Sequence, residues 1–208
     1  ALTSGSTVRA LEESLSCALG EPHLVLLSSG TSALTVALQL AGVMPGDKVV
    51  VPALTWIATA QAALLQGAEV CPADINPNTY CLDEQSLIEQ LESRPKAVIP
   101  VAFNGRVSGY REVIRLAEEH DITVIEDRCK AMGTSALMRG TTSPMTLRTY
   151  SLGMISYVSI GYGGALACRT ANEAEQARLI RDHGVLRWND TYKMPGFNFK
   201  ISDFAAAL

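Results

Sequence analysis

The sequence predicts an α/β protein in which a mostly parallel, seven-stranded sheet carries helices on both faces. Short β-branched or apolar runs alternate along the chain with longer segments of helical period, and turn residues separate the two kinds of segment. An apolar content of 48% over 208 residues is sufficient for one substantial core. Because the chain contains no internal repeat, low-complexity tract or linker, we expect residues 1–208 to form a single domain.

The strands are expected where a short apolar run lies between turn residues. The run KVVV at 48–51 is typical, because Pro-Gly-Asp precedes it and a proline follows it. The expected strands, in chain order, are 23–27, 48–51, 69–72, 97–101, 123–126, 148–152 and 164–168.

The helices are expected in the longer segments between these runs. The first of them is apolar nearly all round, which predicts a central, buried helix. Thr170 with Glu173 three residues later indicates a capping box at the start of the last one. A further helix is expected to begin at Ile201, shortly before the sequence ends. We therefore interpret the chain as a fragment, a split protein or an unusually short relative. The expected helices are 31–41, 57–65, 83–91, 111–119 and 172–181.

Charge and composition restrict the classes of partner. A net charge of −4 and a pI near 5.4 provide no basic surface for nucleic acid or an anionic membrane. The apolar stretches are too short to span a bilayer, and no export signal opens the chain. Five scattered cysteines indicate reduced thiols in a cytoplasmic protein, with no metal site expected. We therefore expect small-molecule or protein partners.

Candidate binding residues follow the strands, at the edge where ligands collect in open α/β sheets. In SSGTSAL, at 28–34, Gly30 permits a tight turn, and the helix start with the hydroxyls of Thr31 and Ser32 favours a phosphate. An ordinary helix N-cap gives the same pattern. Ser151, followed by Gly161, Gly163 and Gly164, is compatible with a second phosphate-binding segment or with a plain turn and loop.

Two further residues suit a planar, nitrogen-containing ring. Trp56 lies at the head of a helix, where an exposed indole can stack on a ring, although a core tryptophan is the alternative. Asp127 ends an apolar strand, and a carboxylate beside a pyridine nitrogen would keep that nitrogen protonated, because an ion pair favours the charged form of both groups. A capping aspartate is the alternative.

The order of these motifs resembles the DegT/DnrJ/StrS family of sugar aminotransferases, which are fold type I enzymes that use pyridoxal phosphate. The likeness extends through PGDKVVVPALTWIATAQAALLQGAEVCPADINPNTYCLD to RDHG and FNFKISDFAAAL near the end. It implies that the chain is the large, cofactor-binding domain, without the small C-terminal domain. It further implies that Gly30, Thr31 and Ser151 bind the cofactor phosphate, that Trp56 stacks on the ring and that Asp127 contacts the ring nitrogen.

The resemblance also implies a dimer. Asn198, in FNF, matches a family asparagine that reaches the phosphate bound by the neighbouring subunit. The expected assembly is a homodimer, or a heterodimer with a complete paralogue.

Besides Ala102 and Asn104, where family members often carry His and Tyr, two positions depart from the family pattern in a way that bears on the amine chemistry. Ser156 occupies the position of the Schiff-base lysine, and a hydroxyl cannot form an imine with the cofactor. Lys130 replaces a glutamine that touches the ring hydroxyl, so that it either reaches the aldehyde carbon or merely pairs with a carboxylate or extends to solvent.

Three functions therefore remain open. The chain is an enzyme that uses pyridoxal or pyridoxamine 5′-phosphate for amino transfer to a keto-sugar nucleotide, with a pyridoxamine-dependent dehydratase as a variant. Alternatively, it is a catalytically silent partner subunit, or a module that binds the cofactor without turnover.

Overall fold

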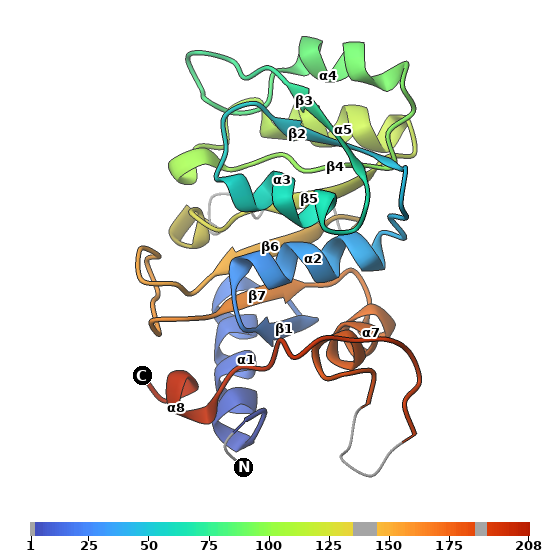
Figure 1. Cartoon of the computed structure of the whole chain (residues 1–208). Helices are drawn as coiled ribbons and strands as arrows, with labels where there is room; N and C mark the ends of the chain where they lie inside the picture. The colour runs from blue at the N-terminus through green and yellow to red at the C-terminus, as the bar shows by residue number, and fades with distance from the viewer. Residues whose placement is uncertain (1–2, 135–144, 186–190) are drawn as a thin grey trace.

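A seven-stranded sheet forms the centre of the molecule (Figure 1). The computed structural model describes residues 3–134, 145–185 and 191–208. The strands lie in the order β1-β7-β6-β5-β4-β2-β3. Their bounds are β1 Leu24–Leu27, β2 Lys48–Pro52, β3 Glu69–Ala73, β4 Ala97–Val98, β5 Thr123–Asp127, β6 Leu147–Ser151 and β7 Gly164–Ala167.

The sheet is parallel except at β7. Strands β2 to β6 pair in parallel with their neighbours, whereas β7 runs antiparallel to both β1 and β6. Strand β4 is shorter than the predicted run 97–101, because Pro100 has no backbone N–H to donate. Pairing resumes at an isolated bridge between Val101 and Asp127, which keeps the end of β5 in register.

Helices cover both faces of the sheet. Helices α2, α3 and α7 pack on one face, and α1, α4 and α5 pack on the other. The residues 49–51 of strand β2 are all apolar because both faces of the strand are covered: Val49 and Val51 pack in the core beneath α2, whereas Val50 packs toward α5. The helices are α1 Ser6–Leu19, α2 Gly30–Leu40, α3 Ile57–Leu64, α4 Glu84–Leu91, α5 Tyr110–Glu119, α7 Ala171–Arg181 and α8 Asp203–Ala206, with short 3₁₀ turns η1 Phe103–Gly105 and η2 Met132–Thr134.

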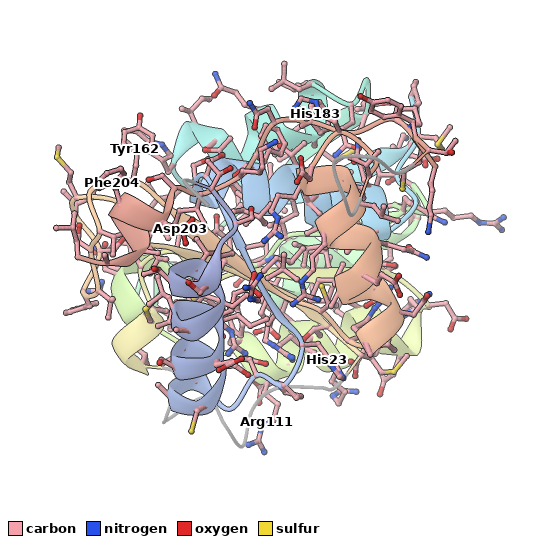
Figure 2. The ribbon with its side chains drawn as sticks, turned by 90° about the horizontal axis from the view of Figure 1, so that it is seen from below. His23, Arg111, Tyr162, His183, Asp203 and Phe204 are labelled. Atoms are coloured by element: carbon pink, nitrogen blue, oxygen red, sulfur yellow. The ribbon has the colours of Figure 1, made fainter. Side chains whose placement is uncertain are left out.

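Helix α1, which the sequence analysis did not predict, protects an edge of the sheet. Its Glu12 carboxylate accepts a hydrogen bond from the Leu26 N–H at 2.9 Å, and Arg181 donates to the Leu26 carbonyl at 3.0 Å. These contacts occupy backbone groups on the side of β1 that pairs with no strand. Asp203, from the end of the chain, accepts from the N–H of Val8 at 3.2 Å and lies beside the start of α1 (Figure 2).

A buried ionic network lies under β5 and β6, on the face opposite α2. Arg128 is 1% exposed and donates to Glu126 at 2.7 Å. It also donates to the hydroxyl of Tyr150, which in turn donates to Glu21 at 2.9 Å. Arg148 pairs with Glu21 at 2.8 Å. Each buried charge therefore has an opposite charge beside it, as burial requires.

The α/β prediction is confirmed in its elements. All seven predicted strands and all five predicted helices are present, within a few residues of the expected ends. The capping box at Thr170 is only half formed: the hydroxyl accepts from Glu173 N–H, but the Glu173 carboxylate accepts from Arg169 N–H instead of Thr170 N–H. Among the described residues, no helix has the length and apolar character needed to cross a membrane.

Candidate active site

Three of the predicted binding residues converge at the carboxyl ends of the parallel strands, on the left of Figure 1. Gly30 begins α2, Asp127 ends β5 and Ser151 ends β6. Cys129 links them, because its N–H donates to Asp127 Oδ1 at 3.1 Å and its Sγ lies against Gly30. Cys129 was not among the predicted site residues.

The start of α2 is packed too tightly to admit a side chain at Gly30. A Cβ there would lie 2.8 Å from Cys129 Sγ and 3.3 Å from Ser151 Cβ. A Cβ at Gly164 would lie 2.2 Å from the carbonyl oxygen of Ser29. The turn before α2 therefore packs directly against β7, and only a glycine fits at this position. The glycines therefore place the N-terminal N–H groups of α2 beside Ser151, an arrangement that suits an anion.

The hydroxyls at this helix start have different partners from those expected. The N-cap is Ser29, and a reciprocal capping box joins it to Ser32. The Ser32 hydroxyl also donates to the Ser29 carbonyl at 2.7 Å. The Ser32 hydroxyl is therefore engaged within the turn, and its expected role as a donor to a ligand stays a prediction, whereas Thr31 is half-buried and makes no hydrogen bond through its hydroxyl to a described residue.

Asp127 is held in one orientation by neutral donors. Its side chain is buried, its Oδ2 accepts from the Thr59 hydroxyl at 2.9 Å and its Oδ1 accepts from the Cys129 N–H. Thr55 lies 2.8 Å from the Thr59 hydroxyl and extends the chain of contacts. Thr59 is a site residue that sequence analysis missed. The signal was its position on the first turn of the helix that Trp56 opens.

Cys129 contributes packing here. Burial, with the adjacent Asp127 carboxylate, raises the pKa of its thiol well above the usual range. The thiol is therefore neutral at physiological pH, and its sulfur packs against Gly30.

Trp56 lies on the outside of the site. It is the N-cap of α3 and is 76% exposed, so the alternative of a core tryptophan does not hold. The Trp56 carbonyl accepts a hydrogen bond from the N–H of Thr59. Trp56 therefore lies one helical turn from the residue whose hydroxyl donates to Asp127.

Ser151 and Ser156 lie on the turn that follows β6. The Ser151 hydroxyl accepts from the Gly153 N–H at 3.2 Å, and the Ser156 N–H donates to the Gly153 carbonyl at 2.9 Å. The hydroxyl oxygen of Ser156 is buried and has no hydrogen-bond partner within the described part of the chain. Such an atom is costly to leave unpaired, which suits a position that faces a ligand.

Lys130 reaches the same turn. Its Nζ donates to the carbonyl of Ile155 at 3.3 Å. Among the described residues it forms no ion pair, so the alternative in which Lys130 pairs with a carboxylate is not observed.

Asn198 is exposed and stands apart from this group. Its segment is fixed by backbone bonds, because Ser28 N–H donates to the Phe199 carbonyl at 2.8 Å and Phe197 N–H donates to the Ile180 carbonyl at 2.7 Å. Phe197 and Phe199 stack on each other, with ring centroids 4.5 Å apart. The Asn198 side chain makes no hydrogen bond to a described residue of its own chain.

Comparison with known proteins identifies the family to which this arrangement belongs. The profile described as "DegT/DnrJ/EryC1/StrS aminotransferase family" matches residues 1–208. The GDP-perosamine synthase of Caulobacter vibrioides is 32% identical over 191 residues, which cover 91% of this chain and 51% of that protein. The UDP-2-acetamido-2-deoxy-3-oxo-D-glucuronate aminotransferase of Pseudomonas aeruginosa is 31% identical over 205 residues, covering 98% and 57%.

A solved structure agrees with these sequence matches. The crystal structure of NtdA from Bacillus subtilis with bound cofactor PMP superimposes with a TM-score of 0.90 at 30% identity, covering 99% of this chain and 47% of that one. The chain spans about half the length of the curated relatives it matches. On both sequence and fold, the chain belongs to the DegT/DnrJ/EryC1/StrS aminotransferase family.

Proposed function

We propose that this chain binds pyridoxal 5′-phosphate or pyridoxamine 5′-phosphate at the carboxyl edge of its sheet. The observation that carries the proposal is the contact of Gly30 with Cys129 and Ser151, beside the oriented carboxylate of Asp127. A helix start without a side chain and an adjacent hydroxyl fit a phosphate group. Gly30, Thr31 and Ser151 would hold the phosphate, and the exposed face of Trp56 would cover the ring.

Asp127 would accept a hydrogen bond from the protonated ring nitrogen of the cofactor. Its carboxylate accepts hydrogen bonds from a hydroxyl and a backbone N–H, and it forms no ion pair with another described residue. A protonated pyridine nitrogen would complete the ion pair, which favours the charged form of both groups. When bound, the cofactor supplies an electron sink for chemistry at a carbon attached to an amino group.

The family-level activity is amino transfer, and a keto-sugar nucleotide is the substrate class we propose. Two relatives support this class, since one is named as a GDP-perosamine synthase and the other as an aminotransferase of a UDP-linked keto sugar. Asn198, exposed and held on a fixed segment, supports a dimer in which it reaches the neighbouring site. That dimer would pair two copies, or this chain and a complete paralogue.

Ser156 favours a second candidate function. It lies on the turn after β6, and the resemblance to the family implies that this is the position of the lysine used in amino transfer. A pyridoxamine-dependent dehydratase-like protein, or a silent partner subunit that completes an active neighbour, would tolerate this replacement.

Ligand titration tests the proposed cofactor. The protein is heated in the presence of pyridoxal 5′-phosphate, pyridoxamine 5′-phosphate or pyridoxamine without phosphate, and the unfolding temperature is measured. We expect the two phosphorylated ligands to raise that temperature and the unphosphorylated control to have little effect, because the α2 site recognises phosphate. If neither phosphorylated ligand raises the unfolding temperature, the proposal is wrong.

A substrate screen then separates the aminotransferase from the silent partner subunit. Amino transfer is assayed with keto-sugar nucleotides and an amino donor, for the protein alone and mixed with a complete paralogue. Turnover by the protein alone supports the aminotransferase. Ligand binding without turnover, with turnover only in the mixture, supports the partner subunit.

A further inference from the structure

The chain contains five lysines, all of them in the described part, and their positions differ in a way that bears on chemistry. Lys48 begins β2 and Lys96 precedes β4, so both lie at the amino edge of the sheet. Lys200 is paired with Asp182 at 2.6 Å, and Lys193 follows α7 in an exposed segment. Lys130 is the lysine that lies in the loop after β5, three residues beyond Asp127.

The Lys130 side chain crosses between two loops of the candidate site. Its backbone lies in the loop that follows β5, and its Nζ donates to Ile155 in the loop that follows β6. Strands β5 and β6 are neighbours in the sheet, with Asp127 opposite Thr149. The ammonium group therefore lies between the loops that follow the two strands carrying Asp127 and Ser151.

The hydrogen bond that holds the Lys130 amine is weak. At 3.3 Å, the bond to the Ile155 carbonyl is longer than most N–H···O bonds, and the acceptor is neutral. The amine can therefore leave this carbonyl for a ligand at small cost. The hydroxyl of Ser156, the next residue, is buried and without a partner among the described residues, so the turn also presents an unsatisfied polar atom.

We infer that Lys130 is the residue to which pyridoxal 5′-phosphate becomes covalently attached, so that the amine of the site comes from the β5 loop and not from the β6 turn. The inference rests on the proposed function. The Lys130 ammonium releases a proton to solvent, and its nitrogen attacks the aldehyde carbon. A C=N bond forms, the C=O bond breaks and the oxygen leaves as water, with no change in oxidation state.

Reductive trapping and peptide mapping test the inference. The protein is incubated with pyridoxal 5′-phosphate, treated with borohydride, digested with trypsin and analysed by mass spectrometry. Borohydride converts the C=N bond into a stable amine, and trypsin does not cut at a modified lysine. We expect the label on the peptide 129–139, which contains Lys130.

Substitution distinguishes a specific site from surface labelling. Lys130→Arg keeps the charge but cannot form the C=N bond, so the label should be lost while pyridoxamine 5′-phosphate still raises the unfolding temperature. Lys193→Arg is the matched control and should leave the label on 129–139. A label on other lysines, or no label in a protein that pyridoxamine 5′-phosphate stabilises, overturns the inference and leaves the proposed function standing. Stabilisation by neither phosphorylated ligand overturns both.

A double substitution tests whether the two loops face the same carbon. In Lys130→Gln combined with Ser156→Lys, the amine moves from the β5 loop to the β6 turn. We expect the label to move to the peptide 149–169. A double variant that pyridoxamine 5′-phosphate stabilises but that takes no label would contradict the placement of Lys130 and Ser156 around one ligand atom.

Discussion

Glu126 and Asp127 are consecutive carboxylates of β5, but they belong to different regions of the molecule. Glu126 points to the face opposite α2, where Arg128 donates to it at 2.7 Å within the buried ionic network. Asp127 lies at the carboxyl edge, where a threonine hydroxyl and a backbone N–H donate to it. Successive side chains of a strand point to opposite faces, which explains how adjacent residues reach such different surroundings.

The difference lies in how each negative charge is balanced. The charge of Glu126 is compensated within the chain by an arginine that is itself buried. The charge of Asp127 is oriented by dipoles, which leaves it able to attract a cationic group of a ligand. A carboxylate neutralised by the fold stabilises that fold, whereas one held only by neutral donors is prepared for a partner.

Glu126→Gln should produce the largest effect. Loss of the charge leaves Arg128 buried beside a neutral amide, and removal of one partner of a buried pair costs about 3–5 kcal/mol. Denaturant unfolding should show this loss, with Glu89→Gln on the exposed side of α4 as control. A loss below about 1 kcal/mol would show that the network is not a source of stability.

Gly164→Ala should come next. The added Cβ would lie 2.2 Å from the Ser29 carbonyl oxygen, and backbone cannot rotate away as a side chain can. We expect a loss of about 2–3 kcal/mol in the free energy of unfolding. At Gly133 a Cβ would lie 3.9 Å from Tyr157, an ordinary contact, so Gly133→Ala is the control. Equal effects of the two substitutions would contradict the close approach of α2 to β7.

Asp127→Asn should separate binding from stability. An amide can still accept from the Cys129 N–H and contact Thr59, so the free energy of unfolding should change by less than about 1 kcal/mol. The affinity for pyridoxamine 5′-phosphate should fall roughly 10- to 100-fold, since a hydrogen bond to a charged group contributes about 1.5–3 kcal/mol. Calorimetric titration measures it. Unchanged affinity would remove Asp127 from the site.

The sequence predicted these strands well because each strand is a local signal. The residues 49–51 are apolar in succession, and α2 and α5 cover their two faces accordingly. Helix α1 was missed although Val8, Leu11, Leu15 and Leu19 recur at a helical period; only its role at the sheet edge depends on distant contacts. Glu12 is fourteen positions from Leu26 and far from Arg181, and nothing in the segment itself reveals the edge that it protects.

The residues of the candidate site also divide into those with a local sequence signal and those defined by contacts between distant residues. Gly30, Asp127 and Ser151 could be selected because they end strands or begin a helix. Thr59 and Cys129 were not selected, because the contacts of Thr59 with Asp127, 68 positions away, and of the Cys129 sulfur with Gly30 join residues that only the fold brings together. The proposed roles of these residues remain predictions that the substitutions above are designed to test.

Trp56→Ala should have the smallest effect and the most selective one. Because the indole is 76% exposed, its removal should change the free energy of unfolding by less than about 0.5 kcal/mol. Stacking on a planar ring contributes about 0.5–1.5 kcal/mol, so the affinity for pyridoxamine 5′-phosphate should fall roughly 2- to 10-fold. Leu65→Ala, at the other end of α3 and 79% exposed, should leave that affinity unchanged. If both substitutions weaken binding equally, the exposed side of the site lies elsewhere, and the contrast between a ring-covering Trp56 and a nitrogen-contacting Asp127 fails.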